Sequence, residues 1–149
     1  MGGNAQDGHG GDADATGAVR QFTTAAERGD GEAQNALGEA LRTGSGVAAR
    51  DSEAAEHWFR TAADDSQHEV AMNNLGLMCQ AGEIPEADSA EAVAWFRKAA
   101  EHGLSAAEVN VARCYEHGLG VDADHNEAAY WYEQVSTRAL SPLTGKNSL

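Results

Sequence analysis

Residues 75–100 read LGLMCQAGEIPEADSAEAVAWFRKAA, and two altered copies of this stretch occur elsewhere in the chain. Its landmarks are a Leu-Gly pair, an aspartate and a Trp-Phe pair. The three copies carry them as Leu37-Gly38, Asp51 and Trp58-Phe59, as Leu75-Gly76, Asp88 and Trp95-Phe96, and as Val111-Ala112, Asp124 and Trp131-Tyr132. The tryptophans at positions 58, 95 and 131 are spaced 37 and 36 residues apart. Self-similarity at such a period indicates stacked helical repeats.

Each copy predicts two helices. In the first helix, apolar residues four apart, such as Leu37 and Leu41, lie on one face. A glycine, which tolerates the left-handed conformation, is expected to end that helix, and an aspartate is expected to cap the second one. The glycines are Gly44, Gly82 and Gly118, and the aspartates are Asp51, Asp88 and Asp124.

The starts of the first helices are predicted from capping residues. Asp30 precedes the first copy, and Ser66 with Glu69 and Ser105 with Glu108 have the spacing of capping boxes. A half copy stands ahead of them and has Gln21 where the full copies have tryptophan. A polar residue there suits a terminal helix whose outer side is uncovered. Counting this half copy, we expect seven helices.

The predicted boundaries follow from these landmarks. They are a disordered Gly- and Asp-rich leader over 1–13, a repeat region over 14–138 and a C-terminal tail over 139–149. Within the repeat region we expect a half repeat over 14–29 and full repeats over 30–65, 66–104 and 105–138.

The repeated pattern resembles the Sel-one-like repeat, a relative of the tetratricopeptide repeat. The resemblance is carried by Ala33 through Ala63 and by Ala107 through Ser136, whereas Leu41 and Cys79 stand where that family usually has tyrosine. It implies an all-α, right-handed α-α superhelical solenoid. It also implies that the first, or A, helices line a concave face, which the family uses mainly to hold other proteins.

Charge restricts the partners. The chain has 10 Lys and Arg against 24 Asp and Glu, a formal charge of −14, which repels phosphate backbones and anionic lipids. We therefore expect neither nucleic acid nor a membrane as partner, and a basic protein or peptide fits better. The alternative is that acidity only confers solubility. No apolar run is long enough for a membrane span and no signal peptide follows Met1, so a cytoplasmic location is expected.

The candidate partner-binding residues are the A-helix positions that do not face the core. Asparagines among them can both donate to and accept from a peptide backbone, Leu77 offers an apolar contact and Arg113 a charge. The alternative is that these are ordinary solvated helix faces. The set is Asn35, Glu39, Arg42, Asn73, Asn74, Leu77, Gln80, Asn110, Arg113, Glu116 and His117.

The sequence gives no sign of catalysis. It lacks the serine, phosphate-loop and zinc motifs, and no two of its six histidines have the spacing of helical metal ligands. We expect no enzyme activity, cofactor or metal, and we expect Cys79 and Cys114 to be reduced thiols. The leading hypothesis is a scaffold or adaptor that binds a protein segment on the concave face. The alternatives are an immunity or inhibitor protein that neutralises a basic toxin and, third, a lactam hydrolase-like enzyme.

Overall fold

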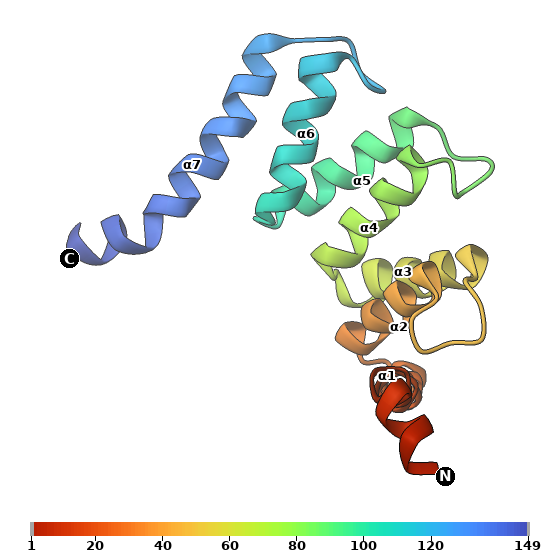
Figure 1. Ribbon diagram of the computed structural model, residues 1–149. Coiled ribbons are helices and arrows are strands. Elements are labelled where there is room, and N and C mark those ends of the chain that lie inside the picture. Colours follow the sequence, from red (N-terminus) through yellow and green to blue (C-terminus); the bar gives the residue numbers. More distant parts are fainter. Residues whose placement is uncertain (1, 149) are drawn as a thin grey trace. The chain divides into compact units, whose positions relative to one another are not determined.

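The computed structural model describes the backbone of residues 2–148 and the side chains of residues 14–139. Over this range the chain forms seven helices and no strand (Figure 1). They are α1 (Gly2–Glu27), α2 (Gly31–Thr43), α3 (Ser52–Ser66), α4 (Glu69–Gln80), α5 (Ser89–Glu101), α6 (Ser105–His117) and α7 (His125–Ser148). The predicted all-α class and seven helices are confirmed. The leader over 1–13 and the tail beyond 139 fall outside the described side chains.

The aspartate caps form as predicted. Asp30 starts α2 by accepting from the Ala33 N–H, and Asp51 and Asp88 cap α3 and α5 in the same way. The carboxylate of Asp124 accepts from two N–H groups in the first turn of α7, at 3.0 and 3.2 Å. These bonds satisfy donors that a helix end leaves unpaired, so four helix starts are determined by local sequence.

The two predicted capping boxes are wrong. Ser66 is the last residue of α3, and the N–H of Ala71 at the start of α4 donates instead to Nδ1 of His68, at 3.2 Å. At α6 the N-cap is Leu104, which provides no side-chain bond. Glu108 is 1% exposed and pairs with Arg138 of α7, so its carboxylate points into the protein rather than back at the helix end.

The chain divides into two compact units, residues 1–71 and 72–149. In the first unit α2 packs on both α1 and α3. Phe59 of α3 is fully buried against Gly38 of α2, where an added Cβ would lie 2.5 Å from the ring. Glycine is therefore required at position 38. Phe22 of α1 packs against a cluster that includes Leu37 of α2.

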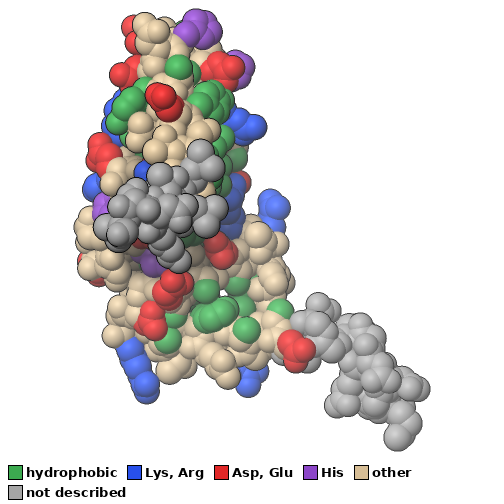
Figure 2. All heavy atoms as spheres, turned by 90° about the vertical axis from the view of Figure 1, so that its left-hand side faces the viewer, with side chains coloured by type: hydrophobic (Ala, Val, Ile, Leu, Met, Phe, Trp, Pro, Cys, Tyr) green, Lys and Arg blue, Asp and Glu red, His purple; other side chains and the backbone are tan. Residues whose placement is uncertain are grey.

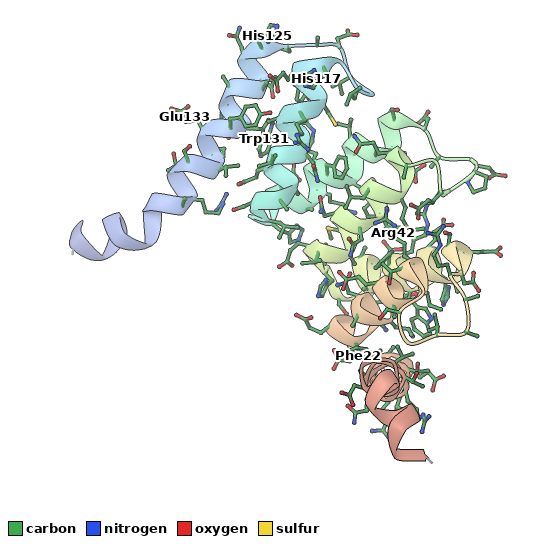
Figure 3. All side chains as sticks on the ribbon, viewed as in Figure 1. Phe22, Arg42, His117, His125, Trp131 and Glu133 are labelled. Carbon is green, nitrogen blue, oxygen red and sulfur yellow. The ribbon has the colours of Figure 1, made fainter. Side chains whose placement is uncertain are left out.

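The second unit repeats this arrangement. Phe96 of α5 is fully buried against Gly76 of α4, α5 packs on α6, and α6 packs on α7. Trp131 extends from α7 toward α6 (Figure 3) and is 8% exposed. The corresponding Trp58 and Trp95 of the first two copies are only half-buried. In the first two copies the buried aromatic is the phenylalanine that follows.

The third copy reverses this order because Ala112 replaces the glycine. A methyl group at that position occupies the space that Phe59 and Phe96 use in the other copies. Tyr132, which corresponds to those phenylalanines, is 37% exposed. Its hydroxyl donates to Oε1 of Glu116 at 2.8 Å, so the ring is held at the surface of α6.

Candidate protein-binding surface

Three of the predicted site residues lie on α2 in the first unit. Asn35 is buried, Arg42 is half-buried and Glu39 is exposed. The Asn35 Nδ2 lies 3.5 Å from Oε2 of Glu39, one turn further along the helix. The burial of Asn35 shows that its amide contributes to the packing of this unit, whereas Glu39 is open to solvent.

The other eight lie in the second unit, where Asn73 of α4 and Asn110 of α6 are brought together. Nδ2 of Asn110 donates to Oδ1 of Asn73 at 2.9 Å, which places the two A helices side by side. Asn73 is 7% exposed and Asn110 is half-buried. An amide has two N–H donors and an oxygen with two lone pairs, so this bond uses only part of what the pair offers.

Exposed and half-buried side chains continue from this amide pair along both helices. On α4, Leu77 is half-buried and Gln80 is exposed, four and seven residues after Asn73 and thus on its face. On α6, Arg113 and His117 are exposed, three and seven residues after Asn110. We call these six residues the A-helix surface: Asn73, Leu77, Gln80, Asn110, Arg113 and His117. Asn74, also a predicted site residue, is buried at 8% exposure, as Asn73 is at 7%.

Glu116 differs from its neighbours because it already has a partner within the protein. It accepts the Tyr132 hydroxyl, and this hydrogen bond raises the pKa of Tyr132 because the proton is held toward a carboxylate, while the nearby Arg113 acts in the opposite direction. Nε2 of His117 lies 3.7 Å from the same carboxylate. Within the described side chains Arg113 has no ion-pair partner, so it is available to an anionic group.

Tyr132 was missed by the sequence-based prediction. The sequence does contain a signal for it. The third copy has a tyrosine where the other two have phenylalanine, and it is also the copy in which alanine replaces the glycine of the Leu-Gly pair. Together the two changes move an aromatic ring with a hydroxyl group from the core to the surface, beside Glu116.

The acidic side chains do not form one cluster on the face that Figure 2 displays. Figure 2 shows them spread over the displayed face, with basic side chains among them. The excess of negative charge therefore acts as a general field of the chain rather than through one local cluster on that face.

The described side chains include neither a candidate metal site nor an activated cysteine. No group of three His, Cys, Asp or Glu within residues 14–139 could hold a metal ion. Cys79 and Cys114 are buried and not disulfide-bonded, and burial raises the pKa of Cys114, which disfavours the nucleophilic thiolate. Over the same residues no helix combines the length and apolar character that a membrane crossing needs.

Comparison with protein families gives a match to the Sel1 repeat over residues 31–66, 70–104 and 105–136, which is more than half of the chain. The chain belongs to the Sel1 repeat family. This is the family that the sequence pattern resembled, and proteins built from this repeat generally act as scaffolds for protein interactions.

Relatives and solved structures agree with this assignment. Chitin synthase regulator SKT5 of Saccharomyces cerevisiae is 29% identical over 136 residues, which are 87% of this chain but 19% of that protein. The regulator of the same name from Malassezia restricta is 33% identical over 58% of this chain and 6% of its own length. The chain thus spans a minor part of these relatives.

Two crystal structures have the same fold. A Sel1 repeat protein from Oxalobacter formigenes matches with a TM-score of 0.77 and 32% identity over 89% of this chain and 53% of its own. A protective antigen of uropathogenic Escherichia coli matches with a TM-score of 0.75 and 35% identity, over 80% of this chain and 25% of its own.

Proposed function

We propose that this Sel1 repeat protein is an adaptor that binds an extended segment of another protein along the A-helix surface. The observation that carries the proposal is the Asn73–Asn110 hydrogen bond, which fixes two amides side by side across neighbouring A helices. Fixed amides lose little conformational entropy when they bond a peptide backbone. We also propose a cytoplasmic location and no enzyme activity.

The surrounding side chains supply contacts that an extended peptide can use. The amide pair retains capacity to donate to and accept from a main chain, Leu77 gives an apolar contact, and Arg113 can bind a carboxylate. Because fungal relatives are named as regulators of chitin synthase, a regulatory role through binding is consistent with this surface.

We propose further that the partner is basic outside the segment that contacts Arg113. The formal charge of −14 creates a field that attracts cationic proteins and accelerates their association. Association should therefore slow as salt rises. An association rate that does not depend on salt would contradict a basic partner.

The test of the adaptor begins with affinity purification of the chain from its native source and mass spectrometry of the proteins recovered. The partner is then offered to a Gln80→Ala/Arg113→Glu variant, since both side chains are exposed and their replacement leaves the core intact. Arg20→Glu, an exposed site on α1, changes the charge equally and is the control. We expect the double variant to recover at least tenfold less partner than the control. Equal recovery from both would refute this placement of the site.

The charge also supports a second candidate, a neutraliser of a cationic toxin, because a strongly acidic protein can cover the basic surface of such a toxin. The test is growth of cells that produce a candidate basic toxin with and without this chain. Growth restored by the chain supports neutralisation, and no rescue removes this candidate while leaving the adaptor proposal in place.

A further inference from the structure

The start of α4 is capped by a histidine, whereas four other helix starts are capped by aspartates. Nδ1 of His68 accepts a hydrogen bond from the Ala71 N–H at 3.2 Å. An imidazole nitrogen accepts only while it carries no proton, and imidazoles gain and lose a proton near neutral pH, where carboxylates stay ionised. The cap of α4 therefore depends on pH in a range where the aspartate caps do not.

The other ring nitrogen of His68 faces α2. Its Nε2 lies 3.6 Å from Oε1 of Glu32, in the first turn of that helix. Because Nδ1 accepts from Ala71, the neutral ring carries its proton on Nε2, on the side of Glu32. The His68 side chain is 12% exposed, and Glu32 is its one ionic partner within the described side chains. The ring is thus held between the start of α4 and the start of α2.

Protonation affects these two contacts unequally. The imidazolium gains an attraction to Glu32, but the Glu32 side chain is 87% exposed, and an ion pair with an exposed partner contributes little. On the other side Nδ1 becomes a donor, so the Ala71 N–H loses its acceptor. Ala71 is fully buried, which prevents water from replacing the lost bond. A positive charge at the N-terminal end of a helix is also opposed by the helix dipole.

The other titratable groups near His68 in sequence are all acidic. Asp64 and Asp65 are exposed at the end of α3, and Glu69 is the first residue of α4. Their negative charge attracts the imidazolium, yet among the described side chains none of them accepts from the Ala71 N–H. These carboxylates therefore favour the charged ring without replacing the cap.

The corresponding position at the next junction has no such contact. Leu104 stands before α6 as His68 stands before α4, and it makes no side-chain bond to the helix start. Of the two helices that carry the A-helix surface, α4 is therefore the one whose start responds to pH through its cap.

We propose that His68 is a pH-sensitive switch at the start of α4. The neutral ring closes the first turn of the helix, and the protonated ring keeps its contact with Glu32, releases Ala71 and loosens that turn. Asn73 and Leu77 follow on the same helix, so acid weakens the α4 side of the A-helix surface. This consequence for binding rests on the proposed adaptor function, whereas the switch itself is a property of the chain.

The test is NMR spectroscopy of the isotopically labelled full chain at about pH 8 and about pH 5, on either side of imidazole protonation. Two-bond proton–nitrogen spectra show which nitrogen of His68 carries the proton, and we expect Nε2 at the higher pH. Hydrogen exchange then gives the protection of the Ala71 amide, corrected for the intrinsic exchange rate at each pH. Protection should fall about fivefold at the lower pH, the factor that corresponds to a typical N-cap.

Two variants serve as controls. His68→Asn keeps an acceptor at the cap at both pH values and should hold the Ala71 protection within about twofold. His57→Gln removes an exposed imidazole of α3 and should show the same fall as the parent chain. An Nδ1–H ring at the higher pH, an Ala71 protection that does not change with pH, or an equal fall in the His68→Asn chain would each overturn the proposal.

Partner binding distinguishes the switch from the adaptor. A partner recovered with the chain should bind the parent several-fold more weakly at the lower pH, and His68→Asn should remove most of this difference. Equal weakening in the parent and in His68→Asn would overturn the effect of the switch on binding. A chain that recovers no partner would remove the adaptor proposal alone, because the NMR measurements need no partner.

Discussion

Replacing Gly120 by alanine should destabilise the protein far more than replacing Gly82, although both glycines have a φ of +76°. In the α6–α7 loop a Cβ on Gly120 would lie 2.5 Å from the carbonyl carbon of Ser89 and 2.9 Å from the N of Ala90. Both atoms are backbone at the start of α5 and cannot rotate away. A Cβ on Gly82 would meet nothing within 4 Å. The pair therefore separates conformational strain from steric overlap.

The magnitudes follow from these two contributions. Alanine in the left-handed region costs roughly 1–2 kcal/mol, of which about 0.4–1 kcal/mol is offset because the unfolded chain loses freedom. Gly82→Ala should therefore cost about 1 kcal/mol. Gly120→Ala adds the cost of overpacking, typically about 1–3 kcal/mol, which gives roughly 2–4 kcal/mol in total.

Urea unfolding followed by circular dichroism measures the two free energies. Because helical repeats can unfold in parts, hydrogen exchange at the first turn of α5 is the local readout. Faster exchange there is expected in the Gly120 variant only. Losses that agree within 0.5 kcal/mol, or unchanged exchange in α5, would refute the packing of this loop against Ser89.

Three further predictions concern single side chains. Gln67 has a φ of +50° in the turn before α4, so Gln67→Gly should stabilise by about 0.5–1 kcal/mol in thermal unfolding, and a loss would contradict the strain. Arg138→Ala should destabilise by leaving Glu108 buried without its cation, and this deficit should shrink when Glu108→Gln is added; a deficit of the same size in the Glu108→Gln background would be inconsistent with the ion pair. The hydrogen bond to Glu116 raises the pKa of Tyr132 in the folded state. The stability that this bond contributes is therefore complete at neutral pH and is lost as pH rises through the raised pKa. Tyr132→Phe should remove this loss of stability at high pH, which a series of melting temperatures measures.

The fold was predictable where its determinants are local. An aspartate at a helix start and a glycine at a helix end act within one turn, so Asp51, Asp88, Gly44 and Gly118 could be assigned from spacing alone. The Ser105 capping box failed because its glutamate has a stronger partner 30 residues away. That partner could be identified only once α7 was placed beside α6.

The candidate surface was predictable in part. The face shared by Asn73 and Leu77 follows from helical periodicity, and Arg113 is exposed as expected. The burial of Asn35 and the Asn73–Asn110 bond depend on how each helix is rotated against its neighbours, which periodicity does not determine. Their consequence for binding nevertheless stays a prediction.

The three repeats are alike enough to mispair during folding, yet one buried position distinguishes them. Three residues before the Leu-Gly position, Gln34 donates to the carbonyl of Ala26, Met72 is apolar, and Glu108 requires Arg138. Exchanging the second and third A helices would bury a carboxylate away from its guanidinium and leave Arg138 facing a thioether. The residue at this position therefore determines which neighbour each A helix can pack against. A repeat of this chain cannot be moved or replaced by a consensus copy unless the residue that it contacts is changed as well.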